Sequence, residues 1–175
     1  ATEIASPQHA EAALKAGLDT FWIGARTTAS PFAVSELAEA LAGTDARILV
    51  KNPLNPDIDL WEGALLRLQQ VGVKSIGAIH RGFSTYAPGV YRNAPLWQLP
   101  IELQRRHPDL TIFVDPSHMA GRRELVPLLC QVGLEMNFAG LMVETHPTPS
   151  MAWSDAAQQL TPKELLSLLD RLQLH

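Results

Sequence analysis

Short apolar runs alternate with longer amphipathic segments along the whole chain. Each apolar run has about the length of a typical strand, and the longer segments repeat their apolar residues at helical spacing. The pattern predicts strands at residues 1–4, 20–25, 47–51, 75–80, 111–114 and 140–144. It predicts helices at residues 7–16, 31–42, 60–71, 97–106, 122–132 and 162–172.

Several of the predicted helices carry start and stop signals. A capping serine stands before a proline suited to the first helical position in Ser6-Pro7 and Ser30-Pro31. Thr161 is followed three residues later by Glu164, which is the spacing of a capping box. Glycines stand where helices are expected to end, at Gly17, Gly43, Gly72 and Gly133.

The order of elements is a βα unit repeated six times. Runs such as "WIGA", "ILV" and "TIFV" are almost continuously apolar, which is typical of parallel strands covered on both faces. A doubly wound sheet and a (β/α)₈ barrel are the two candidates, and no G-x-G-x-x-G follows a strand to favour dinucleotide binding. A barrel has eight strands and roughly 250 residues. We therefore predict a single domain over residues 1–175, a TIM barrel that lacks its first two βα units.

Composition narrows the classes of function. The chain has 175 residues, of which 46% are hydrophobic, and a net charge of −4. It has no basic run with interleaved aromatic residues, so we expect no nucleic-acid partner. Its single cysteine, Cys130, cannot form an internal disulfide, which suits a reducing cytoplasm. No apolar stretch approaches the roughly 20 residues of a membrane span, and no signal peptide is visible, so a cytoplasmic protein is expected.

Three cations follow the ends of successive predicted strands: Arg26 after "WIGA", Lys51 after "RILV", and Arg81 after "SIGAIH". The carboxyl ends of parallel strands form the functional edge of such folds. Cations brought together there would repel unless an anion lay between them, and guanidinium groups match phosphate oxygens. The residues predict a phosphate or carboxylate site; the alternative is that each cation pairs with a nearby acid.

A second group at the strand ends combines His118 after "TIFV", Glu144 after "GLMV", and Asp155 in the following loop. One imidazole nitrogen and two carboxylates suit a divalent first-row metal ion. A capped structural histidine is the alternative, and the position of Asp155 in a loop leaves its convergence open. We expect Asp115 and Ser117 to support His118, because a ligating imidazole commonly donates its second N–H to a partner.

Six segments, in order, closely resemble motifs of the class I 3-deoxy-D-arabino-heptulosonate-7-phosphate (DAHP) synthases in their compact form. They are "WIGARTT", "ILVKNP", "GAIHRGF", "FVDPSHMAGRR", "GLMVETHPTP" and "SDAAQQLTP". The resemblance covers the third to eighth strands of the barrel. It implies condensation of phosphoenolpyruvate with erythrose 4-phosphate, the first step of the shikimate pathway and of aromatic amino-acid biosynthesis.

The resemblance also implies roles for individual residues. Arg26 and Arg81 would hold the phosphate of phosphoenolpyruvate. Lys51 would lie beside its carboxylate and serve in proton transfer, so Lys51 and His118 are the expected catalytic residues. His118, Glu144 and Asp155 would bind a divalent metal ion, with Mn²⁺ expected and Fe, Co or Zn as alternatives. A homo-oligomer is expected. Some relatives in this group carry a fused chorismate mutase domain, and whether one is fused to or associated with this protein, outside this chain, is left open.

Two motifs of the family are absent from the sequence: the G-P-C-S type motif with a metal-ligating cysteine, and the K-P-R-T type loop that contacts both substrates. We therefore expect about the C-terminal three quarters of a barrel, with an incomplete site. One alternative is the related synthase that makes 3-deoxy-D-manno-octulosonate 8-phosphate. Others are a metal-free aldolase or isomerase that uses Lys51 as a Schiff-base amine, and a non-catalytic truncated or degenerate chain.

Overall fold

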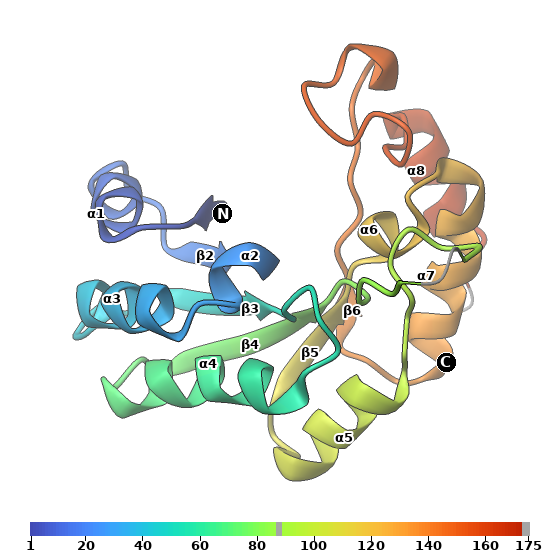
Figure 1. Ribbon diagram of the computed structural model, residues 1–175. Helices are drawn as coiled ribbons and strands as arrows, with labels where there is room; N and C mark the ends of the chain where they lie inside the picture. Colours follow the sequence, from blue (N-terminus) through green and yellow to red (C-terminus); the bar gives the residue numbers. More distant parts are fainter. Residues whose placement is uncertain (87–88, 173–175) are drawn as a thin grey trace. The chain divides into compact units, whose positions relative to one another are not determined.

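The structure is a computed structural model that describes residues 1–86 and 89–172 (Figure 1). In this part of the chain, six strands follow one another across the sheet in chain order, and the pairs β1–β2, β2–β3, β3–β4 and β5–β6 are parallel. The strands are β1 (Thr2–Ile4), β2 (Thr20–Ile23), β3 (Arg47–Lys51), β4 (Ser75–His80), β5 (Thr111–Val114) and β6 (Gly140–Leu141). The order places β1 and β6 at the two ends of the sheet, as a barrel without its first two strands requires.

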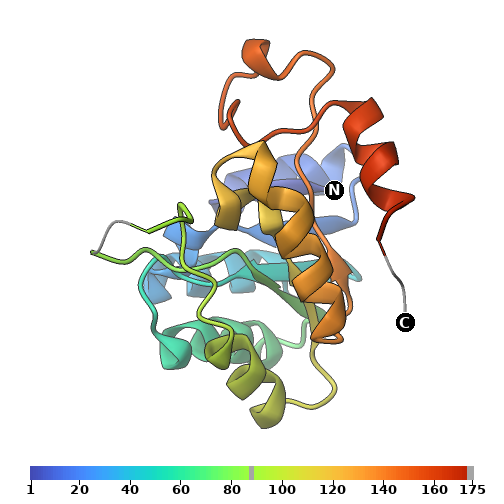
Figure 2. The same ribbon diagram turned by 90° about the vertical axis from the view of Figure 1, so that its right-hand side faces the viewer.

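Helices separate the strands as the sequence predicts. The α-helices are α1 (Pro7–Lys15), α2 (Ala25–Thr28), α3 (Pro31–Leu41), α4 (Ile58–Gln70), α5 (Gln98–Arg106), α6 (Pro116–Ala120), α7 (Val126–Glu135) and α8 (Pro162–Leu169). Two short 3₁₀ helices, η1 (Arg123–Leu125) and η2 (Pro149–Met151), precede α7 and α8. Figures 1 and 2 show the long connection between β6 and α8 that carries η2.

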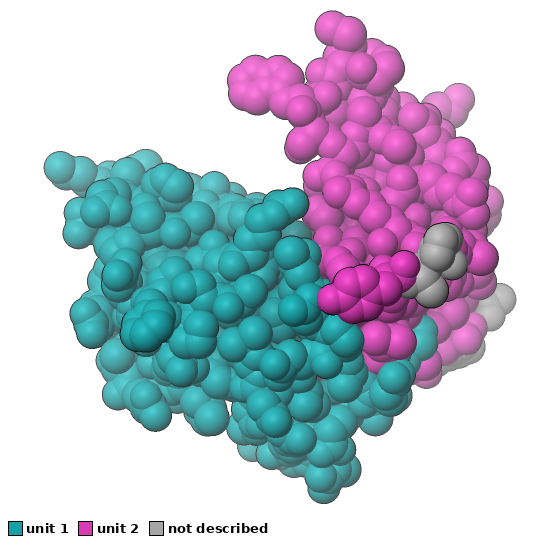
Figure 3. Space-filling model, in the orientation of Figure 1, with its two compact units in different colours: residues 1–79, 97–111 teal, residues 80–96, 112–175 magenta. Residues whose placement is uncertain are grey.

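The chain forms two compact units, coloured separately in Figure 3. Unit 1 contains Ala1–Ile79 and Trp97–Thr111, and unit 2 contains His80–Leu96 and Ile112–His175.

In unit 1, the helices α1, α3, α4 and α5 lie side by side in chain order. Phe21 and Ile48 are fully buried, and the ring nitrogen of the buried Trp61 on α4 donates to the Val50 carbonyl of β3 at 3.1 Å. Trp22, on the alternate face of β2, is only half-buried. In β2, the expectation of strands covered on both faces therefore holds for one face, because side chains alternate between the two faces of a strand.

In unit 2, α7 packs closely against β5. Gly133 lies inside α7, and a Cβ added there would meet the Val114 side chain at 3.2–3.3 Å. The prediction that Gly133 ends a helix is therefore wrong: α7 continues to Glu135, and the glycine allows the helix to approach the strand.

The predicted helix starts are confirmed. Ser6 and Ser30 cap α1 and α3 by accepting from the backbone N–H three residues later, and Thr161 and Glu164 form the capping box of α8. The stop signals at Gly17, Gly43 and Gly72 are confirmed too, because each lies just beyond a helix with a positive φ.

Besides shifts of one to three residues at other element ends and the unpredicted short helix α2, four differences from the sequence prediction are notable. β2 ends at Ile23 because the chain turns into α2, and β6 has two residues where five were expected. The helix expected at 122–132 is divided into η1 and α7, with Pro127 near the start of α7. The short helix α6 was not predicted, although the Asp115-Pro116 pair is a helix start signal. Within the described residues, no helix has the length and apolar character needed to cross a membrane.

Candidate metal centre

His118 is the central residue of the candidate site. β5 ends at Val114, and α6 begins at Pro116, with the fully buried Asp115 as its N-cap. One oxygen of Asp115 accepts from the His118 backbone N–H at 3.1 Å, and the other lies 2.8 Å from Nδ1 of the His118 ring. Asp115 thus holds the backbone of His118, and its second oxygen lies beside the ring nitrogen without the geometry of a hydrogen bond. Carboxylates behind metal-ligating histidines lie in this position. The predicted proximity of Asp115 to the His118 ring is confirmed.

Two carboxylates face the other ring nitrogen. Nε2 of His118 lies 4.0 Å from Oε1 of Glu144 and 3.9 Å from Oδ2 of Asp155. The three potential ligand atoms lie within 4.8 Å of one another, and all three residues are partly exposed. Donor atoms on one first-row ion, bound at about 2.0–2.2 Å, lie roughly 3–4 Å apart. The cluster is thus nearly the right size, and its N/O donor set fits a divalent first-row ion.

The convergence of Asp155, which the sequence left open, is present in the structure. Asp155 has φ +54°, a left-handed conformation that aspartate tolerates better than most residues. Its carbonyl accepts from the Gln158 backbone N–H at 3.1 Å, which closes a tight turn. Downstream, the Leu160 N–H donates to the Glu144 carbonyl at 3.0 Å, so the turn is tied to the segment that carries the other acid.

Ser117 supports a different residue from the one expected. Its hydroxyl oxygen accepts from the Glu144 backbone N–H at 2.9 Å, and Ser117 is fully buried. The expectation that Ser117 supports His118 is therefore corrected: Asp115 lies beside the imidazole, and Ser117 holds the backbone of the facing acid. The motif "DPSH" thus orders two of the three candidate ligands.

The predicted cations lie in both units. Lys51 is the last residue of β3 and is buried, whereas Arg26 lies in the short helix α2 and not directly at a strand end; both are in unit 1. Arg81 follows β4 in unit 2 and is also buried. The convergence of all three on one anion stays a prediction.

Arg81 is connected to α6 through Asn93. Nη1 of Arg81 donates to Oδ1 of Asn93 at 2.9 Å, and Nδ2 of Asn93 donates to the His118 carbonyl at 2.6 Å. The loop after β4 is therefore fastened to the helix that carries the candidate metal ligand. His80, the residue before Arg81, is fully buried. Burial lowers the pKa of its imidazole to about 3, so the ring is neutral at pH 7.

Three residues of this site were missed by the sequence analysis: Arg92, Asn93 and Gln158. They lie in irregular connections, where no periodicity marks a side chain as buried or inward-facing. The one available signal was their position in segments that follow strands β4 and β6, whose ends already carried predicted site residues.

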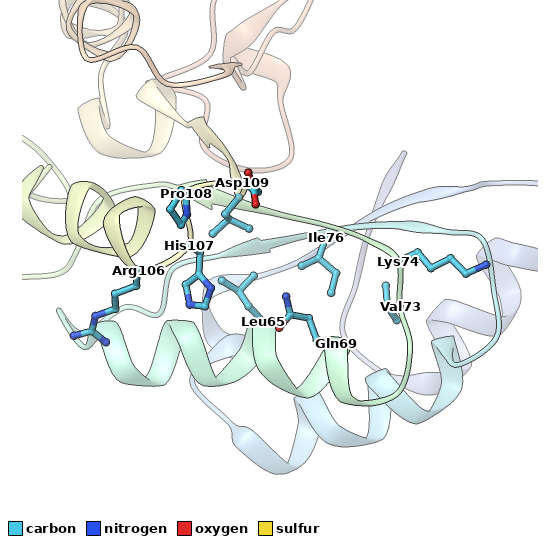
Figure 4. Close-up of a pocket in the computed structure, with 10 residues that line it drawn as sticks. Leu65, Gln69, Val73, Lys74, Ile76, Arg106, His107, Pro108 and Asp109 are labelled. Carbon is cyan, nitrogen blue, oxygen red and sulfur yellow. The ribbon is translucent and has the colours of Figure 1, made fainter.

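A separate cavity of about 330 Å³ lies in unit 1, between α4 and the segment after α5 (Figure 4). Its lining includes Leu65, Gln69, Ile76, Arg106 and His107. Arg106 and His107 also reach Glu62 of α4, each at 2.6 Å.

These contacts explain the charge state of Glu62. Burial raises its pKa, but the hydrogen bonds from His107 and Arg106 outweigh that effect and leave the pKa below its usual value. The cavity lies at the amino ends of β4 and β5, the edge that serves stability in barrel folds. It contains none of the predicted site residues.

A parallel sheet built of βα units, with polar and charged groups beyond its strand ends, is the architecture of a barrel enzyme. The comparison with known families is specific: the chain belongs to the DAHP synthetase I family, whose model matches residues 1–173. The predicted family is thus confirmed.

Two curated relatives illustrate the similarity. The chain is 38% identical over 80 residues to phospho-2-dehydro-3-deoxyheptonate aldolase of Thermotoga maritima. The matched segment is 46% of this chain and 23% of that enzyme. It is 42% identical over 52 residues to 2-dehydro-3-deoxyphosphooctonate aldolase of Acidovorax sp. (strain JS42). That segment is 30% of this chain and 18% of that enzyme. These matches span only a minor part of either relative.

Solved structures match almost the whole chain. A truncated 3-deoxy-D-arabino-heptulosonate 7-phosphate synthase from Thermotoga maritima matches with a TM-score of 0.84 and 26% identity, over 96% of this chain and 62% of that one. The crystal structure of a Thermotoga maritima DAHP synthase matches with a TM-score of 0.85 and 25% identity, over 97% of this chain and 48% of that one. The predicted fold, part of a TIM barrel, is confirmed.

Proposed function

We propose that this chain is the C-terminal part of the barrel of a DAHP synthase, an enzyme that condenses phosphoenolpyruvate with erythrose 4-phosphate. The observation that carries the proposal is the cluster of His118, Glu144 and Asp155, with Asp115 behind the imidazole. Membership of the DAHP synthetase I family supports it, and so does the similarity to synthases of that name over nearly the whole chain.

In the proposed reaction, C3 of phosphoenolpyruvate attacks the aldehyde carbon of erythrose 4-phosphate, water adds at C2, and phosphate leaves by cleavage of its C–O bond. The atoms balance as two substrates and one water giving DAHP and inorganic phosphate. A divalent ion, when bound, supplies Lewis-acid polarisation of the aldehyde carbonyl. We propose that His118, Glu144 and Asp155 hold that ion, Mn²⁺ in the first instance, with one further ligand from outside the 175 residues.

The cations have proposed roles in binding and proton transfer. Arg81 and Arg26 bind phosphate oxygens of phosphoenolpyruvate, and Lys51 binds its carboxylate and moves a proton at the reacting carbons. Arginine forks suit phosphate, and lysine acts as a compact charge that also exchanges a proton. Replacing Arg81 by Lys keeps the charge and loses the fork. We therefore expect weaker phosphoenolpyruvate binding in a titration, and unchanged affinity would assign Arg81 a structural role.

The test of the reaction follows an oxygen atom. Phosphoenolpyruvate labelled with ¹⁸O in the bridging position is incubated with erythrose 4-phosphate, Mn²⁺ and the protein, either as this chain or as any longer natural polypeptide that contains it. The expected result is labelled inorganic phosphate together with DAHP, both identified by mass. No product from the longest natural polypeptide would refute the proposed activity and favour a non-catalytic chain.

Two controls distinguish the alternatives. Arabinose 5-phosphate in place of erythrose 4-phosphate tests octulosonate synthesis, which the 42% identity to the Acidovorax enzyme over 52 residues keeps under consideration. Borohydride added during turnover tests a Schiff base at Lys51. We expect the faster reaction with erythrose 4-phosphate and no reduced adduct on the lysine.

A further inference from the structure

The two acids of the candidate metal centre each divide their oxygens between two tasks. Glu144 turns Oε1 toward His118, while its Oε2 accepts from the side-chain amide of Gln158. Asp155 turns Oδ2 toward His118, while its Oδ1 accepts from Nη1 of Arg92. Each carboxylate is therefore held by one oxygen and presents the other.

The groups that hold the two acids are themselves joined. Nη1 of Arg92 donates to Oδ1 of Asp155 at 2.5 Å and to Oε1 of Gln158 at 2.9 Å, and Nε2 of Gln158 donates to Oε2 of Glu144 at 2.5 Å. The orientation of the amide follows from chemistry, because a guanidinium can only donate and a carboxylate can only accept. Gln158 is only 1% exposed, and these two bonds satisfy both ends of its amide inside the protein, as buried polar groups require.

Arg92 is fixed in place by its surroundings. Its backbone N–H and that of Asn93 donate to the carbonyls of Ala120 and Met119, at 3.4 and 3.1 Å. Gly121 adjoins the arginine so closely that a Cβ there would collide with the Cβ of Arg92. The guanidinium thus starts from an anchored backbone, although its side chain is 48% exposed.

We propose that Arg92 and Gln158 are positioning residues of the metal centre, which restrict Glu144 and Asp155 to one ligand oxygen each. This inference rests on the proposed metal-binding role of the cluster. Groups that hold metal ligands from behind typically change metal affinity by about 10–100-fold when they are removed. Gln158→Leu, which changes no charge, should therefore weaken Mn²⁺ binding by about that factor.

Arg92 distinguishes positioning from simple charge effects. If the arginine acted only as a neighbouring positive charge, its removal would strengthen the binding of a cation. If it holds Asp155 and Gln158 in register, Arg92→Met weakens binding despite the loss of positive charge. We expect at least about a tenfold loss, within the range for such supporting groups.

The experiment measures Mn²⁺ affinity in the longest natural polypeptide that contains this chain, through the electron paramagnetic resonance signal of free Mn²⁺. The visible absorption of bound Co²⁺ reports ligand geometry independently of catalysis. Arg123→Met and Gln131→Leu are the matched controls, because Arg123 and Gln131 pair with Glu164 and Glu135, outside the metal cluster. His118→Ala is the positive control for loss of the site.

The outcomes separate this inference from the proposed function. Weaker binding and an altered Co²⁺ spectrum in both variants, with unchanged controls, support the positioning role. Unchanged affinity in both variants, while His118→Ala abolishes binding, overturns the inference and leaves the metal centre intact. No binding by the unaltered polypeptide that supplies the fourth ligand overturns both. Because the Arg92 side chain is half-exposed, Arg92→Met remains informative if the buried Gln158→Leu variant fails to fold.

Discussion

Gly121 is the position where one methyl group is expected to disturb both the fold and the candidate metal centre. It ends α6 with φ +68°, a left-handed conformation. Replacement by alanine introduces the Cβ strain of that region, about 1–2 kcal/mol. The new methyl group would also collide with Cβ of Arg92 and lie 3.1–3.2 Å from its Cδ and Cγ. Cβ cannot swing away as the end of a side chain can, so the backbone of the loop must move.

Gly43 provides the matched control. It also follows a helix with a positive φ, +73°, and an added Cβ there meets nothing within 4 Å. Gly43→Ala should therefore cost only the conformational strain, about 1–2 kcal/mol. Part of this cost is offset, because alanine lowers the conformational entropy of the unfolded chain. Gly121→Ala should cost about 1–3 kcal/mol more, which is the usual range for overpacking.

Urea denaturation of the two variants measures this difference, provided that the slope with denaturant is the same for both. Gly121→Ala should also weaken Mn²⁺ binding, because the loop that moves carries Arg92, whereas Gly43→Ala should not. Equal denaturation midpoints for the two variants would refute the collision. A normal Mn²⁺ affinity in a destabilised Gly121→Ala protein would show that the loop can move without disturbing the acids.

Three further results are expected. Burial lowers the pKa of His80 to about 3, so below pH 6.5 the unfolded chain takes up a proton that the folded chain does not. Stability should fall as the pH falls from about 6.5 toward 3, by about 1.5 kcal/mol between pH 6.5 and 5. His80→Gln should remove that part of the pH dependence in urea titrations. Burial raises the pKa of the Cys130 thiol to about 12, so an aromatic disulfide reagent should label it no faster than the chain unfolds; rapid labelling of native protein would contradict this. Asp115→Asn should weaken Mn²⁺ binding about 10–100-fold, and equal affinity would show that the aspartate serves only as a helix cap.

The sequence was sufficient for the regular part of the fold. The bounds of β3, β4 and β5 agree with the structure residue for residue, because each apolar run stops at a polar residue or a turn. Gly133 shows the limit of such signals. A glycine ends a helix or lies within one according to what packs on it, and here Val114 of β5 requires the close approach. That contact joins segments far apart in the chain and is not visible locally.

In the candidate site too, local sequence patterns predicted some residues, whereas contacts between distant segments determined others. Strand ends predicted His118 and Glu144, because parallel strands end at one edge. The same reasoning assigned Ser117 to the neighbouring His118, since it considered only nearby residues, whereas the hydroxyl bonds to Glu144, 27 residues away. Arg92 and Gln158 were missed because loops follow paths set by long-range contacts. The contact between Arg92 and Gln158 spans 66 residues.

The supporting residues also explain how two acids can lie close together before an ion binds. Candidate ligand oxygens of Glu144 and Asp155 lie within 4.8 Å of each other, and two like charges at about 4 Å repel by about 1 kcal/mol in water and about 4 kcal/mol near a protein surface. Arg92 places a positive charge on Asp155, and Gln158 donates to Glu144, so part of this repulsion is offset from behind. An ion arriving from the other side then meets oxygens that are already oriented. Two of the three candidate ligands, His118 and Glu144, follow strand ends, but the contacts that orient the acids come from the loops.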